Sequence, residues 1–173
     1  SLVKDIVTGF FILLENQFAV GDVVTITGQT GTVEGISLRA TRLRQLSGTL
    51  HVIPNGQIAS VANLTRDWAR VTLDVGVGDG SDIGSVADTI TAVGESMMVE
   101  PEWEEVMEEA PFYVGIVKLD DSAVVVRVQV KVTPGDQWGV ERELNRRLLA
   151  AFAKEGIEIP FPQRVVWHQN QQV

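Results

Sequence analysis

Residues 21–38 read GDVVTITGQTGTVEGISL, and this stretch decides the first half of the fold. Residues 23–27 and 32–38 predict two β-strands, and residues 28–31 between them predict a hairpin turn. Two further strands are expected at 40–46 and 49–53, and the second ends at the turn motif Pro54, Asn55 and Gly56. Short strands with turns every 8–10 residues are typical of a small barrel or sandwich.

After residue 70 the pattern changes to strands that alternate with helices. Residues 71–75 alternate as a strand, and Asp82 is placed to cap a helix with apolar residues every three or four positions. Residues 112–116 and 124–132 alternate as two more strands, with five valines on one face of the second. Asp136 and Gly156 are placed to begin and end a second helix. The order β-α-β-β-α predicts a ferredoxin-like (split βαβ) domain, so the fold class is α+β.

The N-terminal segment has apolar residues at helical spacing, and it ends at Glu15. The residues are Leu2, Ile6, Phe10 and Leu13. A helix of this length is too short to cross a bilayer, which takes about 20 apolar residues. Two interpretations stay open at this point: an amphipathic helix packed on its own domain, or the end of a membrane helix.

Composition excludes several classes of protein. The 173 residues are 45% hydrophobic and 21% charged, which is typical of a globular chain and not of a disordered one. Without cysteine, the chain has no disulfide, no thiolate nucleophile and no zinc–cysteine site. A net charge of −9 opposes binding to nucleic acid or to anionic lipid.

No motif predicts catalysis, a cofactor or a metal. Residues 76–81 (GVGDGS) lack the third glycine of a dinucleotide fingerprint, so we interpret them as a flexible strand-to-helix connection. His51 and His168 have no ligand partner at metal-binding spacing. The glutamates between residues 100 and 109 lack the alternation of a calcium loop, and a solvated acidic surface is expected there.

A basic cluster in the strand-rich half raises the question of RNA. Arg39, Arg42 and Arg44 lie close together, and small barrels are common RNA-binding folds. RNA binding uses aromatic stacking platforms, and no aromatic residue lies between Phe18 and Trp68. Ion pairs within or between subunits are therefore the favoured interpretation of these arginines.

Four separated segments resemble the small-conductance mechanosensitive channel (MscS) family, in the order of that family. They are residues 4–24 (KDIVTGFFILLENQFAVGDVV), 31–36 (GTVEGI), 53–58 (IPNGQI) and 156–163 (GIEIPFPQ). The resemblance covers about residues 1 to 168. It implies that residues 1–16 are the lower part of the third transmembrane (pore) helix, which leaves a pore-helix remnant in this chain. It also implies an Sm-like small β-barrel domain at 17–66, a ferredoxin-like α/β domain at 67–163 and a C-terminal strand and tail at 164–173.

The resemblance implies a homoheptameric channel of the bacterial inner membrane that opens under tension and releases solutes on osmotic downshock. Gly9 matches the glycine beside which the family's pore helix flexes. Val165, Val166 and Trp167 are expected to join an inter-subunit barrel that closes the base of a hollow cytoplasmic vestibule. The full-length chain would contact membrane lipids, and ions and small solutes would pass through the vestibule.

This chain lacks the first two transmembrane helices and the upper pore helix, so we expect it to be part of a longer protein. It would then supply assembly and permeation filtering without gating, and it would not be an enzyme, bind a cofactor or bind nucleic acid. The alternatives are a soluble Sm-like module that binds RNA or protein, and an enzyme at residues 76–81.

Overall fold

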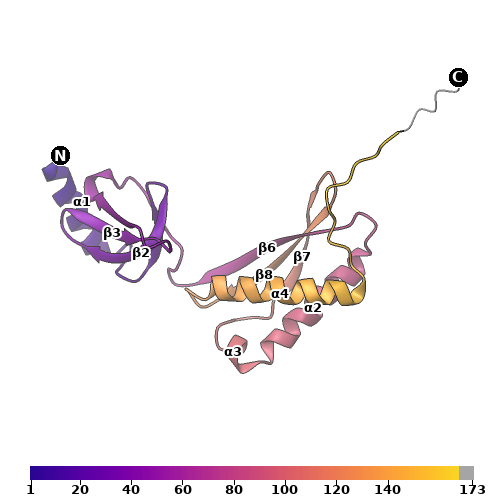
Figure 1. The fold of residues 1–173 in the computed structure, drawn as a ribbon. Helices are drawn as coiled ribbons and strands as arrows, with labels where there is room; N and C mark the ends of the chain where they lie inside the picture. Colours follow the sequence, from indigo (N-terminus) through magenta and orange to yellow (C-terminus); the bar gives the residue numbers. More distant parts are fainter. Residues whose placement is uncertain (168–173) are drawn as a thin grey trace, which may run out of the picture. The chain divides into compact units, whose positions relative to one another are not determined.

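The structure is a computed structural model that describes residues 1–167. The chain divides into two compact units, Ser1–Ala69 and a second unit that begins at Arg70 (Figure 1). The α+β fold class is confirmed, since each unit combines helix with antiparallel strands. No helix within residues 1–167 is both long and apolar enough to cross a bilayer.

The first unit is a helix followed by a five-stranded antiparallel sheet. Its elements are α1 (Leu2–Glu15), β1 (Val23–Ile26), β2 (Gln29–Ile36), β3 (Ala40–Arg44), β4 (Leu50–Pro54), the 3₁₀ helix η1 (Asn55–Gln57) and β5 (Val61–Asn63). The strand order is β4-β3-β2-β1-β5, so β4 and β5 are the two edges of the sheet. The core is formed by Phe18 and the inward residues of four strands, with Ile12 of α1 packed against them.

The first hairpin is tighter than the sequence predicts. The turn is made by Thr27 and Gly28, whose φ angles are 49° and 78°. Two consecutive residues with positive φ are typical of the two-residue turns that match the twist of a hairpin. The expected four-residue turn at 28–31 is therefore wrong. Gly31 instead belongs to β2, where a Cβ would lie 2.7 Å from the carbonyl oxygen of Arg44 on β3.

Helix α1 does not bury its apolar stripe. Its buried residues are Gly9 and Ile12, whereas Leu2 and Phe10 are 57% and 52% exposed. The interpretation of a helix packed on its own domain by Leu2, Ile6, Phe10 and Leu13 is therefore wrong about the face. Most of the apolar surface of α1 has no cover within its own unit.

The second unit has three strands and two long helices. Its elements are β6 (Ala69–Val77), α2 (Ile83–Met98), α3 (Pro101–Glu104), β7 (Phe112–Leu119), β8 (Val124–Val132) and α4 (Gln137–Glu155). The strand order β6-β8-β7 is that of the split βαβ unit, with no fourth strand beside β6 in the described part of the chain. Figure 1 shows α2 and α4 side by side against the sheet.

The core of this unit follows the alternation of the sequence. Val126, Val128, Val130 and Val132 are fully buried. The buried residues of the two helices include Val140, Leu144 and Leu148 of α4 and Val86 and Ile90 of α2. Asp82 caps α2, because its carboxylate accepts the N–H of Gly84 at 3.0 Å. Gly156 ends α4 at a φ of 70°, as predicted. Asp136 stands at the start of α4, but its side chain makes no capping hydrogen bond there.

Candidate functional site

Helix α1 is joined to the sheet of the first unit by a polar contact, and the same helix carries an exposed apolar surface. The Asp5 carboxylate of α1 accepts the N–H of Gly56 at 2.9 Å. One turn later, Gly9 lies against the loop before β3 and against Asn55 of η1. Asp5 and Gly9 share one face of the helix because four residues are about one turn.

Gly9 is needed at this junction for close approach. A Cβ at this position would overlap the carbonyl oxygen of Leu38 and the side-chain amide of Asn55, and it would lie 2.7 Å from the Leu38 carbonyl carbon. Any larger residue must therefore push the helix away from the sheet. Helix α1 is continuous through Gly9, from Leu2 to Glu15. The expected role of Gly9 as a flexing point therefore stays a prediction.

Asn55 holds the sheet side of the junction together. Its side chain is fully buried. Its Oδ1 accepts the Thr41 hydroxyl at 2.9 Å, and its Nδ2 donates to the carbonyl oxygens of Ser37 and Leu38 at 2.8 and 3.0 Å. Pro54, Asn55 and Gly56 end β4 as the sequence predicts, and they also join that strand to the loop beside Gly9.

The outer face of α1 is apolar and uncovered. Eight of its residues are between 42% and 72% exposed: Leu2, Val3, Ile6, Val7, Phe10, Phe11, Leu13 and Leu14. A continuous apolar surface of this kind marks contact with protein or membrane. The same helix therefore has one face fixed to its own unit and another face that needs a partner.

The sheet edges of the first unit are a second surface without cover. β4 and β5 lie at opposite ends of the strand order, and no hydrogen-bonded ladder joins them. On β4, Leu50 and Val52 are 38% and 60% exposed. Unpaired edges that carry apolar side chains favour the addition of another strand.

The C-terminal residues expected to join an inter-subunit barrel lie outside any strand of the single chain. Val165, Val166 and Trp167 are 83%, 68% and 90% exposed. Their part in a barrel stays a prediction, because only one copy is described. His168, the last residue of the expected strand, lies outside the described residues.

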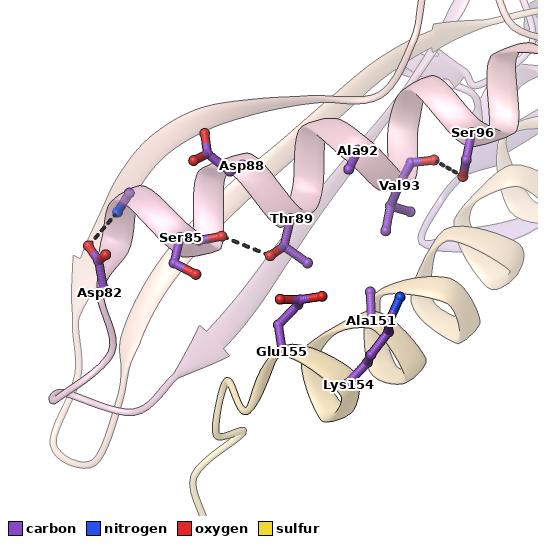
Figure 2. Close-up of a pocket in the computed structure, with 11 residues that line it drawn as sticks. Asp82, Ser85, Asp88, Thr89, Ala92, Val93, Ser96, Ala151, Lys154 and Glu155 are labelled. Atoms are coloured by element: carbon purple, nitrogen blue, oxygen red, sulfur yellow. Dashed lines mark hydrogen bonds between the residues drawn. The ribbon is translucent and has the colours of Figure 1, made fainter.

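Several polar side chains lie between the two long helices of the second unit, and those with hydrogen bonds in the structure have structural roles. A groove of the second unit lies between α2 and α4 (Figure 2) and is lined by Asp82, Ser85, Thr89, Ser96 and Glu155 among others. The Thr89 and Ser96 hydroxyls donate to carbonyl oxygens of their own helix at 2.8 Å, and Asp82 is a cap. These groups therefore hold α2 together and do not converge on a substrate.

No cluster of three or more His, Asp or Glu side chains within residues 1–167 is arranged to hold a metal ion. His51 lies on β4, and its Nε2 is buried without a hydrogen-bond partner in that part of the chain. His51 is therefore a residue of an edge strand, and its placement does not indicate a metal ligand.

The acidic segment carries ion pairs on its solvated surface. Glu100 makes a bidentate pair with Arg147 of α4, both distances being 2.7 Å, and Arg147 also donates to Glu143 at 2.7 Å. Hydrogen bonds from Arg146 and Arg147 lower the pKa of Glu143 to about 2. Glu108 pairs with Lys131 at 2.6 Å. The side chains of Glu100 and Glu108 are 45% and 47% exposed, so they face solvent as expected, and they also tie the α2–β7 connection to α4 and β8.

The basic cluster is explained in part by an ion pair. Arg44 binds Glu34 on the neighbouring strand through two contacts of 2.7 and 3.0 Å, and this hydrogen bonding lowers the pKa of Glu34. The Arg42 guanidinium lies over Gly35, where a Cβ would be 2.7 Å from it. Arg44 therefore forms the kind of ion pair that this interpretation predicts, whereas for Arg39 and Arg42 the interpretation stays a prediction.

Comparison with known proteins identifies the family. Residues 1–66 match the model of the mechanosensitive ion channel beta-domain, and residues 71–159 match the model of the mechanosensitive ion channel MscS C-terminal region. The chain belongs to the MscS family of mechanosensitive ion channels. This family is one of ion channels and not of enzymes, and the match confirms the resemblance seen in the sequence.

Relatives in other organisms show the same relation over most of this chain. A small-conductance mechanosensitive channel of Caldanaerobacter subterraneus subsp. tengcongensis is 38% identical over 166 residues, which are 96% of this chain and 58% of that protein. YbiO of Escherichia coli, a moderate conductance mechanosensitive channel, is 34% identical over 92% of this chain and 22% of its own length. The chain thus spans less than two thirds of these MscS relatives.

Solved structures agree with the fold. The closed state of Helicobacter pylori MscS superposes with a TM-score of 0.82 at 30% identity, covering 98% of this chain and 66% of that one. Arabidopsis thaliana MSL1 gives a TM-score of 0.66 at 15% identity, which shows the shared fold alone. The chain thus has the beta-domain and the C-terminal region of an MscS-type channel, and the alternative of a soluble RNA-binding or interaction module is not favoured.

Two features of the junction were missed by reasoning from sequence. Asp5 is one of three charged residues in the mostly apolar helix α1, one turn before Gly9, and that spacing could have indicated a polar contact on the glycine face. Thr41 gave no signal of its own, because its buried bond to Asn55 depends on the pairing of β3 with β4.

Proposed function

We propose that this chain forms the vestibule region of a channel that opens under membrane tension and releases solutes on osmotic downshock. One observation carries the proposal: α1 is fixed to its unit by Asp5 and Gly9 while its apolar outer face stays exposed. Because the chain belongs to the MscS family, this helix would be the lower part of a helix that lines a membrane-embedded pore in the full-length protein. The full-length protein would lie in the bacterial inner membrane, with lipids around the helix and this region on the cytoplasmic side.

The region would assemble as a homoheptamer. The edges β4 and β5 end the same open sheet, so pairing β4 of one copy with β5 of the next repeats in one direction. Head-to-tail contacts of this type generate closed rings when the rotation closes. The exposed Leu50 and Val52 on β4 would then be covered by the neighbouring copy.

The C-terminal residues would close the base of the vestibule. Val165, Val166 and Trp167 are exposed in one copy, and strands supplied by seven copies would pair without leaving an edge. Seven copies at −9 each carry a formal charge of −63, so the assembled region would be acidic as a whole, and its field would bias the ions that pass through its openings. The region would therefore act in assembly and permeation filtering, while gating would reside in the membrane-embedded part of the full-length protein.

Deletion of residues 164–173 from the full-length channel tests the assembly role. We expect fewer complete rings and more small oligomers in native mass spectrometry, because the edges at the base are lost. A deletion variant that keeps the wild-type distribution of subunit numbers would contradict the role of the tail.

A further inference from the structure

The segment that follows α4 is held against its own unit at three points. The N–H of Gly78 donates to the carbonyl oxygen of Glu158 at 2.9 Å. The N–H of Gln163 donates to the Ser122 hydroxyl at 3.2 Å. Between these bonds, Ile159 lines an apolar pocket of about 310 Å³. Residues 157–163 therefore follow a defined path after the helix ends.

The pocket under Ile159 belongs to the body of the second unit. Val75 of β6 and Leu148, Leu149 and Phe152 of α4 line it. Ile159 is 42% exposed and lines this pocket together with them. The middle of the segment thus borders an apolar hollow of the unit, between the two hydrogen bonds that join the segment to the body.

The glycine-rich loop at 76–81 gains a structural role from this contact. A Cβ on Gly78 would lie 3.5 Å from the Glu158 carboxylate, and a Cβ on Gly76 would lie 3.4 Å from the Cβ of Ala123. The loop thus lies against both the C-terminal segment and the turn between β7 and β8. The interpretation of residues 76–81 as a merely flexible connection is therefore incomplete.

The contacts stop where the exposed tail begins. Among residues 1–167, Gln163 is the last that donates a hydrogen bond to the body, and Val165 to Trp167 are all at least 68% exposed. In Figure 1 the yellow C-terminal segment leads away from the body of the second unit. The two last contacts therefore determine where the tail departs.

We propose that Gly78, Ser122 and the pocket under Ile159 form a guide that positions residues 164–173 for pairing with neighbouring copies of this chain. The inference rests on the proposed assembly and names the residues that direct it. Freeing residues 157–163 would lengthen the flexible tether, and a longer tether lowers the effective concentration of its end at the neighbouring copy. The guide keeps that tether short.

Two measurements on the full-length channel test the guide: deuterium uptake by residues 157–163, and subunit number by native mass spectrometry. Ser122→Ala removes the acceptor, Ser122→Thr keeps it, and Ile159→Ser removes an apolar side chain from the lining of the pocket. Ser85→Ala on α2 is the matched control. We expect about fivefold faster uptake in Ser122→Ala, equivalent to ~1 kcal/mol for one neutral hydrogen bond. We also expect fewer complete rings for Ser122→Ala and Ile159→Ser, and wild-type behaviour for Ser122→Thr and Ser85→Ala.

The outcomes separate the guide from the assembly it serves. If deleting residues 164–173 weakens the ring while Ser122→Ala and Ile159→Ser leave uptake or subunit number unchanged, the guide is refuted and the proposed function stands. If the deletion leaves the ring intact, the tail has no part in assembly, and the guide's role falls with it.

Discussion

Replacing Gly9 with alanine should separate α1 from its sheet. A Cβ there would overlap the Leu38 carbonyl oxygen and the Asn55 amide. Overpacking of this kind costs about 1–3 kcal/mol, and an Asn55 side chain that moves away weakens bonds to two carbonyl oxygens, each worth about 1 kcal/mol. The higher helix propensity of alanine offsets about 1 kcal/mol of this cost. The net loss is about 1–3 kcal/mol for the docked state.

Amide hydrogen exchange in α1 of the full-length channel measures this loss directly. A cost of about 1–3 kcal/mol raises the population of the undocked helix roughly 5- to 150-fold, with a matching rise in exchange rate. The patch-clamp pressure threshold should shift as well, while the rest of the region stays folded. Gly139→Ala in α4 is the matched control, because nothing lies within 4 Å of a Cβ at that position. Unchanged or slower exchange in α1 of Gly9→Ala would refute the close-approach account.

Further predictions concern the second unit. Gly94→Ala places a Cβ on the carbonyl oxygen of Pro111 and should lower the unfolding temperature of this unit by an amount equivalent to about 1–3 kcal/mol; a value at or above wild type would contradict the tight packing of α2. Because hydrogen bonds to arginine lower the pKa of Glu143 from 4.5 to about 2, its contribution to stability is complete above pH 4.5 and is lost as the pH falls toward 2. Glu143→Gln should therefore flatten the pH dependence of the unfolding temperature in this window; a profile like that of wild type would exclude the contribution. Arg147→Met should destabilise the unit by about 1–3 kcal/mol in urea unfolding at pH 7, since Glu143 loses a partner; no change would show that the ion pairs add nothing.

The sequence predicted the elements that have a clear period or cap. The valine alternation over residues 124–132 gave β8 and its buried face, and Asp82 and Gly156 marked helix ends. The resemblance to the MscS family gave the order of the two folds, and the family match bears it out. Local patterns succeed here because alternation and capping are set by residues close together in the chain.

The contacts that make the site could not be predicted from local patterns. Gly9, Asn55 and Leu38 are far apart in sequence, and their contact depends on how α1 crosses the sheet. The outward direction of the α1 apolar stripe was likewise hidden, because spacing identifies a face without saying what covers it. The hydrogen bond between Ser122 and Gln163 joins a turn to an irregular segment. Neither has a hydrophobic period from which this contact could be predicted.

Subunit number and symmetry of the full-length channel test the central claim most directly. The unpaired β4 and β5 edges and the exposed tail require neighbouring copies to cover them. An electron cryo-microscopy reconstruction should show seven copies around one axis, with β4 of each paired to β5 of the next. A monomer, or a complex in which both edges stay open to solvent, would contradict the account.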